Sequence, residues 1–585
     1  MKTPRASLVL LAFLFLAASQ PAAAHWSADP TVNVPVCALP ANQGAPLIVS
    51  DGAGGVVIVW GDGRSSSVDQ YALRLQATGD ADPAWPATGQ ALCLAPFNQY
   101  NDFPQRNGAI VSDGAGGAIV CWQDKRKGNA NIDIYAQHVL GSGEVDPFWP
   151  PDGCAVSAAE GGVKEYPVIT SDGVGGAFIA WQDSRNEGDH DLYVQRVLST
   201  GTVDTRWPAH GLAVAVAPHL QVSARIVSDG SGGAIVCWGD RRSITSIDIY
   251  GQRLNAAGIP QWTPNGHPIW IGTGDAQDIA ILADGVGGAI ITWSTHLNPS
   301  YDIYAQRVSH SGLLLWGAQG APVCTEPGSQ YNPAIAPDGS GGAIIVWDEG
   351  YVRAQRLAGD GSIQWDPAGV LVCSVPNHGV HPTIVPDGIG GAIIGWEDTR
   401  NDVETDPDPD FDINNVDIYA QHVLAGGIVD PVWPTDGRAI CTAPDAQYYP
   451  VAAVDGSGGA IFAWVDNRVK SYDVYAQRVD HAGRLGTPFV SVPTEAMSAL
   501  AIESATPNPA PHGRTTLTFV LPTSAEARLE CFDTTGRRVP GTSRTIFGAG
   551  RHRAELSDRP MAPGVYLIRL SQGQDSHSRR VVVLE

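Results

Sequence analysis

The chain is poor in charge. Charged residues make up 16% of its 585 residues, whereas a typical soluble domain has roughly 25%. Basic residues are the scarcer kind, with 36 Lys and Arg against 60 Asp and Glu and a formal net charge of −24. Contacts to phosphate need clustered Lys and Arg, so this balance argues against a nucleic-acid partner. It favours solubility and is compatible with cation binding.

Helical periodicity and common catalytic motifs are also missing. No segment of useful length carries apolar residues at the spacing of an amphipathic helix. The chain has no His-Glu-x-x-His, no Gly-x-Ser-x-Gly, no phosphate loop and no Cys-x-x-Cys. These absences argue against the enzyme classes built on those motifs. They leave other catalysis open, because Asp and Glu are plentiful.

One apolar run occurs, at the N-terminus. Lys2 and Arg5 precede the run from Ser7 to Ala18, and small residues follow at Ala22–Ala24. This order is typical of a signal peptide, so we predict that residues 1–24 are removed before His25. The run is too short to favour a membrane span, and no other segment reaches membrane length. We therefore expect a mature protein outside the cytoplasm with no membrane span.

Turn-forming residues are abundant. The chain has 67 Gly and 43 Pro, well above their usual combined share of about 12%. Trp is also frequent, at 17. Many Gly and Pro with many aromatic residues indicate short strands joined by tight turns.

A repeat dominates the sequence. The motif Asp-Gly-x-Gly-Gly, followed after four residues by Trp, occurs eight times, at spacings typical of propeller blades. The motif begins at Asp51, Asp113, Asp172, Asp229, Asp284, Asp338, Asp387 and Asp455.

Each unit is predicted to hold four strands. In the second unit these are Ala109–Ser112, Ala118–Trp122, Asp133–Val139 and a strand within Trp149–Val156, with a tight turn at Asp113–Gly117. The second strand is apolar on both faces, as expected for a strand covered on both sides. We therefore predict an all-β fold, with a β-propeller of about eight four-stranded blades over residues 25–495.

Blade count and ring closure stay open at this stage. Seven blades or a distorted ring are rivals to eight. The last blade has two candidates for its fourth strand, Pro488–Val492 and Val32–Cys37, of which one would close the ring.

The nine Cys residues do not suggest a disulfide framework. Equivalent positions of different blades are too far apart for a bond that needs Cα atoms within about 7 Å. A Cys93–Cys121 bridge is conceivable, but we interpret most Cys as small buried hydrophobic residues. Cys121 and Cys237 share one position of the repeat, and six others are assigned to another: Cys37, Cys93, Cys154, Cys324, Cys373 and Cys441.

A different unit begins after the repeats. Residues 496–585 carry alternating segments at Thr515–Leu521, Ala527–Phe532, Gly564–Leu570 and Arg580–Leu584. This pattern predicts a small antiparallel β-sandwich.

The motifs of this unit resemble a known family. Pro507-Asn508-Pro509, Leu521-Pro522, Phe532-Asp533 with Gly536-Arg537, and Pro563–Tyr566 follow in order. This order resembles the C-terminal sorting domains of bacterial type IX secretion and the related Ig-like domains of the flagellar hook-capping type. The resemblance implies an Ig-like fold, secretion machinery as a partner, and release or attachment at the cell surface. The final Glu585 departs from the basic ending common in that family. A purely structural Ig-like module is the alternative.

Polar residues recur in the blades. Six of the eight units carry Trp-x-Asp-x-Arg after the second strand, as at Trp181, Asp183 and Arg185, and Tyr-x-Gln-Arg or a variant follows. A group repeated in nearly every blade is expected to serve the blade itself, with Asp accepting hydrogen bonds and Arg bridging to a neighbour. A ring of ligand-binding residues is the other interpretation.

Departures from the repeat are the better candidates for function. They include Ser294–His296, Asp348-Glu349 with almost no following loop, and an acidic insertion at Asn401–Val416. Alternating acids favour Ca²⁺, which takes six to eight oxygen ligands. The predicted calcium ligands are Asp406, Asp408, Asp410 and Asp412, with a solvated acidic loop as the alternative.

Two functions fit these observations best. The first is a secreted or surface-attached propeller that binds an extracellular polymer, glycan or protein. The second is an extracellular propeller hydrolase or lyase acting on glycans, which predicts paired carboxylates of raised pKa in the central funnel. A self-assembling surface-layer component is a third. Neither catalytic nor ligand-binding residues follow from the sequence alone.

Overall fold

The computed structural model describes residues 25–584 with gaps. The gaps are Ser66 and residues 100–107, 158–160, 187–188, 297–299, 377–378, 403–414, 487–499, 507–509, 512–515, 522–526, 540–543, 547–549, 556–560 and 574. The predicted signal peptide, residues 1–24, lies outside the described residues. The chain divides into two compact units, Met1–Pro488 and Phe489–Glu585.

The described part of the first unit is all β and forms eight four-stranded antiparallel sheets, as predicted. Each sheet is a blade, and its strands are called A to D in order from the first. Blades 1 to 4 consist of β2 (Gln43–Ser50), β3 (Val56–Asp62), β4 (Asp69–Leu75) and β5 (Gln90–Cys93); β6 (Gly108–Ser112), β7 (Ala118–Asp124), β8 (Asp133–Val139) and β9 (Cys154–Ser157); β10 (Lys164–Ser171), β11 (Ala177–Asp183), β12 (Asp191–Val197) and β13 (Leu212–Ala215); and β14 (Gln221–Ser228), β15 (Ala234–Asp240), β16 (Asp248–Leu254) and β17 (His267–Trp270).

The other four blades have the same order. They consist of β18 (Ala276–Ala283), β19 (Ala289–His296), β20 (Tyr301–Val308) and β21 (Ala321–Cys324); β22 (Tyr331–Pro337), β23 (Ala343–Asp348), β24 (Val352–Leu357) and β25 (Val370–Cys373); β26 (Gly379–Pro386), β27 (Ala392–Asp398), β28 (Asp417–Val423) and β29 (Arg438–Cys441); and β30 (Gln447–Val454), β31 (Ala460–Asp466), β32 (Asp473–Val479) and β1 (Val34–Cys37).

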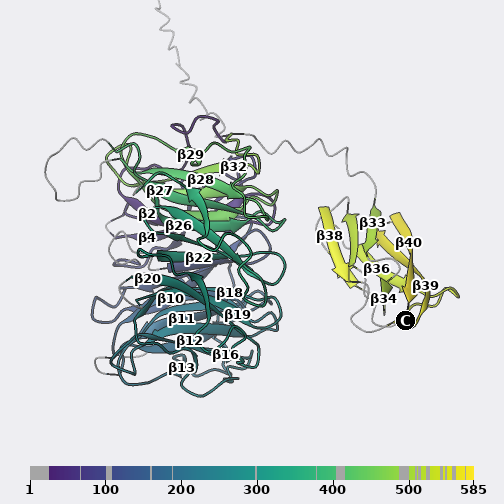
Figure 1. The fold of residues 1–585 in the computed structure, drawn as a ribbon, viewed down its shortest axis with the longest axis horizontal. Helices are drawn as coiled ribbons and strands as arrows, with labels where there is room; N and C mark the ends of the chain where they lie inside the picture. Colours follow the sequence, from purple (N-terminus) through teal and green to yellow (C-terminus); the bar gives the residue numbers. More distant parts are fainter. Residues whose placement is uncertain are drawn as a thin grey trace, which may run out of the picture. The chain divides into compact units, whose positions relative to one another are not determined.

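The eight blades form a closed ring. Each strand A contacts the strand A of the next blade, and β30 of blade 8 contacts β2 of blade 1. These strands therefore surround the central axis, as in a β-propeller. The chain closes the ring with its N-terminal strand, because β1 pairs antiparallel with β32. Figure 1 shows the purple start of the described chain beside the green strands of the last blade. Of the two candidates for this strand, Val32–Cys37 is correct, and residues 488–492 are not described.

Strand B is the core of every blade. In seven of the eight blades all of its residues are buried, and in β19 only the terminal His296 is exposed. Its Trp is at most 1% exposed in each blade. Neighbouring blades cover both faces of the strand, which explains why its sequence is apolar throughout rather than alternating.

A second Trp in each blade joins it to the next blade. Its indole Nε1 donates to a carbonyl oxygen in the turn after strand C of that next blade. Blade 8 takes this Trp from the N-terminus, since Trp26 donates to Ala77 at 2.9 Å. Together with the strand B residues, these account for 16 of the 17 Trp. The pairs are Trp26–Ala77, Trp85–Gly141, Trp149–Ser199, Trp207–Ala256, Trp262–His310, Trp316–Gly359, Trp365–Ala425 and Trp433–His481.

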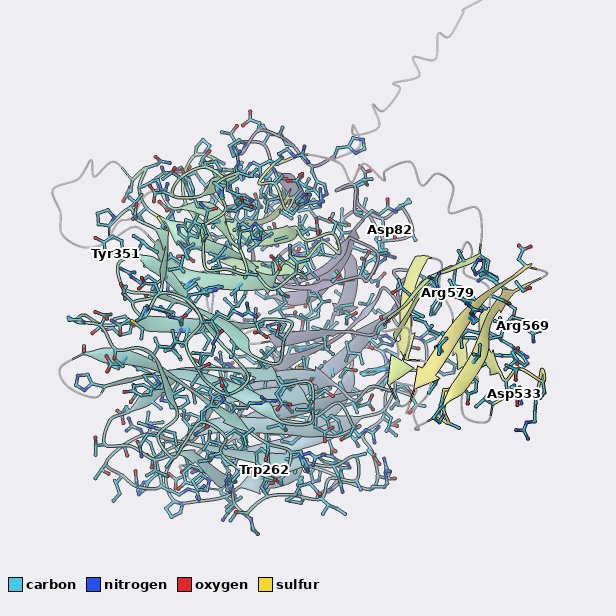
Figure 2. The ribbon with its side chains drawn as sticks, turned by 45° about the vertical axis from the view of Figure 1, so that its right-hand side comes forward. Asp82, Trp262, Tyr351, Asp533, Arg569 and Arg579 are labelled. Carbon is cyan, nitrogen blue, oxygen red and sulfur yellow. The ribbon has the colours of Figure 1, made fainter. Side chains whose placement is uncertain are left out.

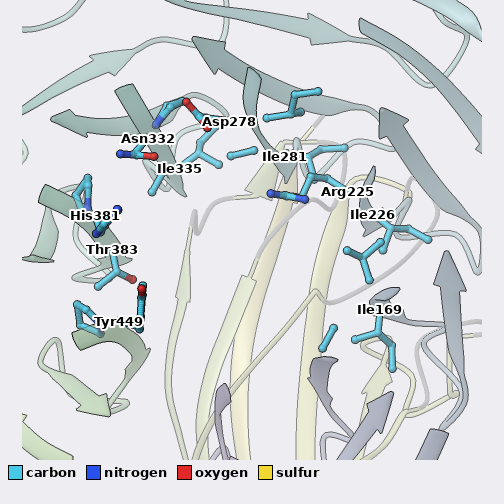
Figure 3. A pocket seen from close by; sticks show the side chains of 18 residues that line it. Ile169, Arg225, Ile226, Asp278, Ile281, Asn332, Ile335, His381, Thr383 and Tyr449 are labelled. Carbon is cyan, nitrogen blue, oxygen red and sulfur yellow. The ribbon is translucent and has the colours of Figure 1, made fainter. Parts of the chain in front are cut away.

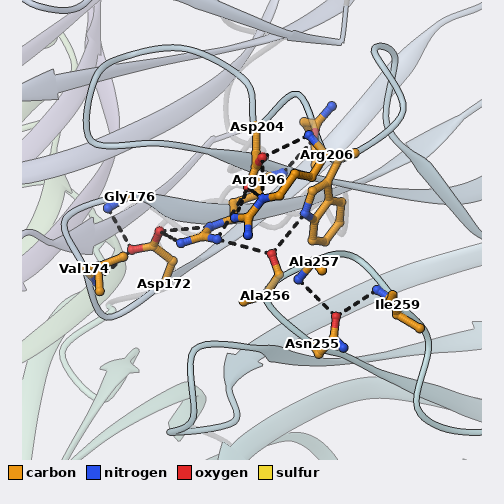
Figure 4. Close-up of polar contacts among 12 residues, drawn as sticks. Asp172, Val174, Gly176, Arg196, Asp204, Arg206, Asn255, Ala256, Ala257 and Ile259 are labelled. Atoms are coloured by element: carbon orange, nitrogen blue, oxygen red, sulfur yellow. Dashed lines mark hydrogen bonds and ion pairs between the residues drawn. The ribbon is translucent and has the colours of Figure 1, made fainter.

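An ion pair strengthens this link. Arg196 of strand C donates to Asp172 of its own Asp-Gly turn, at 2.7 Å from Nη2 to Oδ2, and to the carbonyl of Ala256 in blade 4 at 3.2 Å (Figure 4). Asp172 also accepts from the turn amides of Val174 and Gly176. In blades 2 and 7 the Arg is replaced by His138 and His422, each held between two Asp side chains.

The Trp-x-Asp-x-Arg motif serves the blade, as expected. Asp124 accepts from the indole of Trp122 at 2.9 Å and from Arg126, whose guanidinium lies 3.6 Å over the ring of Tyr135. Arg126 also reaches Cys93 in strand D of the preceding blade, at 3.3 Å from Nη2 to Sγ. The same arrangement of Trp, Asp, Arg and Tyr occurs in all six blades with the motif.

The two blades that lack the motif differ from each other. In blade 6, Glu349 accepts from Trp347 at 3.2 Å and from Arg353, so it replaces the missing Asp. In blade 5, Thr295 stands in the Asp position, and the buried indole nitrogen of Trp293 has no hydrogen-bond partner among the described residues. Trp270 of blade 4 packs against Trp293 instead.

All nine Cys are free and buried, so the conceivable Cys93–Cys121 bridge is not formed. One assignment was wrong. Five of the six Cys end strand D, but Cys154 begins it, and Ser157 takes the equivalent end position. Ser157 accepts from Arg185 at 3.4 Å, as Cys93 does from Arg126. Six blades therefore end strand D with a Cys or Ser, whereas β13 ends with Ala215 and β17 with Trp270.

The second unit is a two-sheet β-sandwich. One sheet has the order β33-β35-β38 and the other β34-β40-β39-β36-β37. Side chains of both sheets form its core, among them Phe519 and Ile568. The predicted strands are confirmed, but β34 pairs parallel with β40, so the sandwich is not wholly antiparallel. The strands are β33 (Ala501–Thr506), β34 (Ala510–Pro511), β35 (Thr516–Leu521), β36 (Ala527–Phe532), β37 (Arg544–Ile546), β38 (Gly550–Glu555), β39 (Gly564–Gln572) and β40 (Asp575–Leu584).

The Asp-Gly turn chemistry of the blades recurs in this sandwich. The predicted turn Asp533–Arg537 is present, with Gly536 at φ 83°. Asp533 accepts from the hydroxyl of Thr535 and from the amides of Thr535 and Arg537, and these bonds lower its pKa to about 2. Arg569 on β39 pairs with Glu530 on β36 at 2.9 Å; Asp533 and Arg569 are labelled in Figure 2. Among the residues described, no helix is long and apolar enough to cross a membrane.

Candidate functional site

Strand A contains a β-bulge that we did not predict from the sequence. In seven blades its register against strand B shifts near its start, as between Glu165 and Val168 in blade 3. In each of these bulges a residue other than Gly adopts a left-handed conformation, with φ between 49° and 55°. We call these residues the bulge ring: Ala45, Tyr166, Ser223, Asp278, Asn332, His381 and Tyr449.

The bulge ring is strained, and it is repeated. A left-handed non-Gly residue costs on the order of 1 kcal/mol or more. A bulge can re-aim a side chain, which is one reason why proteins keep such a feature. Six of the seven ring residues line the central cavities, the exception being Ala45. The strain therefore accompanies a ring of side chains that face the channel.

The channel holds two connected cavities. The first has a volume of about 640 Å³ and is lined by strands A of blades 2 to 8 (Figure 3). The second, of about 520 Å³, is lined by blades 2 to 4. Both are lined by Ala109, Val168 and Arg225, so they meet at these residues. Their sizes are in the range of small-molecule sites.

The bulge ring lies near one face of the propeller. Strand A starts beside the bulge and ends at the Asp-Gly turn, so the ring lies toward the face that carries the connections from D to A and from B to C. We call this the loop face and the opposite one the turn face.

Blades 5 to 8 contribute a polar wall. Asp278 accepts from Ser294 at 2.9 Å, and Asn332 donates to Asp348 at 3.0 Å. Asp348 also accepts from the backbone amide of His381 at 3.1 Å. It is 5% exposed, and burial raises the pKa of its carboxyl against the opposing hydrogen bonds.

His381 stands between two carboxylates. Its Nδ1 lies 3.1 Å from Oε2 of Glu397, which is 4% exposed. The other oxygen of Glu397 accepts from the amide of Tyr449 at 2.6 Å. The rings of His381 and Tyr449 lie 6.2 Å apart. Strand B side chains of blades 6 and 7 thus hold the bulge residues of blades 7 and 8 in place.

The opposite wall is mostly apolar, with one cation. Ile169 and Ile226 line it together with Arg225, whose side chain points into the cavity in Figure 3. Arg225 is half-buried and lines both cavities. Burial lowers the pKa of this guanidinium, against the opposing effect of Asp278.

The predicted calcium ligands, Asp406, Asp408, Asp410 and Asp412, lie outside the described residues. At the edges of that insertion, Asn401 donates to Asp417 at 2.7 Å, and burial raises the pKa of Asp417 to about 6. Among the residues that the structure describes, no group of three His, Cys, Asp or Glu could hold a metal ion. The calcium site stays a prediction.

Of the residues predicted as departures from the repeat, some contact the bulge ring and others do not. Ser294 and Asp348 bind the ring residues Asp278 and Asn332. Thr295 and Glu349 instead occupy the position of the Asp in Trp-x-Asp-x-Arg, beside the strand B Trp. The sequence reasoning missed Arg225, Asp278, Asn332, His381 and Glu397. A signal for the bulge ring existed, because its seven residues each stand six places before an Asp-Gly and are of six different types.

Comparisons with known proteins give only distant matches. No protein-family model matches the chain, and no curated protein does. A puromycin hydrolase structure aligns with a TM-score of 0.41 and 15% identity, over 76% of this chain and 61% of its own. A puromycin-hydrolyzing peptidase of Mycobacterium tuberculosis aligns with a TM-score of 0.39 and 12% identity, over the same shares. An endo-arabinase from Bacteroides thetaiotaomicron has a TM-score of 0.26 and 12% identity, over 47% of this chain and 95% of its own.

The chain spans about three fifths of the length of the first two structures. At these identities and TM-scores, the likeness assigns no activity to the chain. The candidate site therefore stands on its own geometry.

Proposed function

We propose that this chain is a secreted propeller that binds an extracellular polymer at the loop-face mouth of its channel. The observation that carries the proposal is the bulge ring. Strained backbone is kept in every described bulge, and it presents a different side chain from nearly every blade. The recurrent Trp, Asp and Arg, in contrast, are engaged in contacts within and between blades. Secretion is inferred from the N-terminal apolar run and from the motifs of the C-terminal sandwich.

The ring chemistry favours a glycan as the polymer. Tyr166 and Tyr449 offer aromatic faces, and Asp278, Asn332 and His381 offer hydrogen-bond groups at the same level of the channel. Sugar rings present hydroxyl groups at their edges and apolar C–H faces. Such a ligand can use both kinds of group in one site.

The test is binding of the full secreted chain to a glycan and matrix-protein array, with calcium and again with chelator. Tyr449→Ala should lower affinity about tenfold, because it removes a large contact surface from the site. Phe148→Ala is the matched control, since Phe148 is 79% exposed and lies on the turn face. Equal binding by both variants, or binding by neither parent nor variants, would refute the proposal. Loss of binding with chelator alone would assign a role to the acidic insertion.

A glycan hydrolase is the second candidate. It is favoured by one observation, the buried Asp348 of raised pKa beside His381 and Glu397. A carboxyl group of raised pKa can act as a general acid. Release of reducing ends from a bound glycan, abolished by Asp348→Asn with binding retained, would establish this activity. Bound glycan that stays intact over hours would rule it out.

A further inference from the structure

Arg225 stands where the repeat otherwise places no charge. It lies four residues before the Asp-Gly of its blade. The equivalent residues of the other blades are Leu47, Ala109, Val168, Ala280, Ala334, Thr383 and Val451. The position faces the channel, so a small or apolar residue satisfies the fold there. Arg225 is therefore not required by the blade.

Arg225 also lacks the ion pair that other Arg residues of the propeller make. Arg196 and Arg185, for example, each bind an Asp of their own blade. Within the described ranges, no ion pair includes Arg225. Among the described residues, its side chain donates from Nη1 to the carbonyl oxygen of Ala224, at 2.8 Å. The guanidinium thus keeps most of its five donors directed at the cavity.

A guanidinium in such a place is suited to an anion. Removing a charge from water is costly unless it is paired, and a planar fork of donors matches a carboxylate in two-point geometry. Arg225 lies where the two cavities meet, so a ligand in either one can reach it. The neighbouring blade 5 brings the carboxylate of Asp278 into the same cavity. Behind the ring, the buried carboxylates of Asp348 and Glu397 hold Asn332, His381 and Tyr449.

These carboxylates decide between classes of acidic ligand. A polymer with many negative charges, such as an acidic peptide, would meet repulsion from them. A sugar with one carboxylate can place it on Arg225 and direct its hydroxyl groups to the polar side chains of blades 5 to 8 that line the same cavity, such as Asp278 and Asn332. Tyr449 adds an aromatic face on the same side as His381.

Building on the proposed glycan binding, we infer that Arg225 selects uronic-acid units, binding the uronate carboxylate in the channel. The polar wall of blades 5 to 8 then holds the hydroxyl groups of the same unit. The chain thus discriminates a uronate from the neutral sugar of identical ring stereochemistry.

The experiment uses the full secreted chain and pairs of oligosaccharides. Oligogalacturonate and oligomannuronate are each compared with their carboxyl-reduced, neutral counterparts by calorimetry. The parent should bind at least one uronate about tenfold to a hundredfold more tightly than its neutral partner, as a charge-assisted pair predicts. Arg225→Gln should remove this preference, so that the variant binds the uronate and its neutral partner with similar affinity. Arg206→Gln is the control, because it removes the same charge from an exposed turn-face side chain.

Each outcome is decisive. Equal binding of uronate and neutral partner by the parent overturns the inference and leaves glycan binding standing. A preference that survives Arg225→Gln overturns it too. Absence of binding to every sugar, with an array that also shows none, refutes the proposed function and the inference with it. Arg225→Val, which copies blades 3 and 8, gives a second variant whose fold the repeat already tolerates.

Discussion

Strand B and the bulge ring are two regions of the same blades with opposite patterns in the sequence. Strand B repeats the same pattern in all eight blades and is almost wholly buried. The bulge ring repeats its backbone, with φ near 50°, but hardly repeats a side chain. Strand B packs between neighbouring blades, so all eight blades have the same packing requirement. The bulge ring faces the central axis, where the side chain of each blade can differ, and the result is a single asymmetric site.

The largest effect is expected in strand B. Trp181→Ala removes a side chain that is 0% exposed and donates to Asp183, so the free energy of unfolding should fall by about 3–5 kcal/mol. Tyr166→Ala in the bulge ring of the same blade should cost no more than about 1 kcal/mol. Tyr166 is 43% exposed, and Ala45 already holds this conformation in blade 1. Scanning calorimetry compares the two. Equal losses of unfolding free energy in the two variants would contradict the assignment of strand B to the scaffold and of the bulge ring to the binding site.

A second comparison sets two Arg residues against each other. Arg196→Val leaves the buried Asp172 without its cation and should cost about 3–5 kcal/mol. Arg225→Val relieves a desolvated charge that has no carboxylate partner in the described chain, and should stabilise the propeller by about 1 kcal/mol. Calorimetry at pH 7 gives both values. A loss of stability in Arg225→Val would show that this guanidinium serves the fold.

A smaller, pH-dependent effect is expected in the scaffold. Burial opposes the charge on His138 and His422, but hydrogen bonds to Asp113 and Asp146, and to Asp387 and Asp430, outweigh it and raise the pKa of each ring. Protonated His in the fold therefore contributes fully below about pH 6.5, the unfolded value, and less as pH rises through the folded pKa.

Replacing both residues by Arg, the residue of most other blades, should remove this loss. The double variant should be more stable than the parent above neutral pH, by about 1 kcal/mol per site. Melting temperatures measured from pH 5 to pH 9 test this. Parallel curves for parent and variant would contradict it, and sugar binding should be the same in both proteins because neither His lines the channel.

The strands of the blades could be predicted because their signals are local. The Asp-Gly turns, the double-sided apolar strand and the spacing of Trp each depend on a few neighbouring residues. Closure by Val34–Cys37 could not be decided, since Pro488–Val492 carries an equally good strand pattern and pairing with β32 depends on a contact between distant parts of the chain. The position of Cys154 could not be predicted for the same reason. It lies three residues before the position of the other Cys in strand D, and only the pairing of strand D with strand C shows this difference.

The channel site could not be predicted from local sequence patterns. Arg225, Asp278, Asn332 and His381 are ordinary residues in their own segments, far apart along the chain. Only the bulge re-aims the ring residues toward the axis, and only the ring brings the blades together there.

The sequence by itself determined an all-β fold of eight repeated units, because turn chemistry and strand burial act within each unit of about 50 residues. It also favoured a role within the blades for the repeated Trp, Asp and Arg, which the contacts in the structure confirm. The tertiary structure decided how the ring closes and which side chains share the channel. Those depend on contacts between blades, and such contacts leave no fixed spacing for a sequence pattern to reveal.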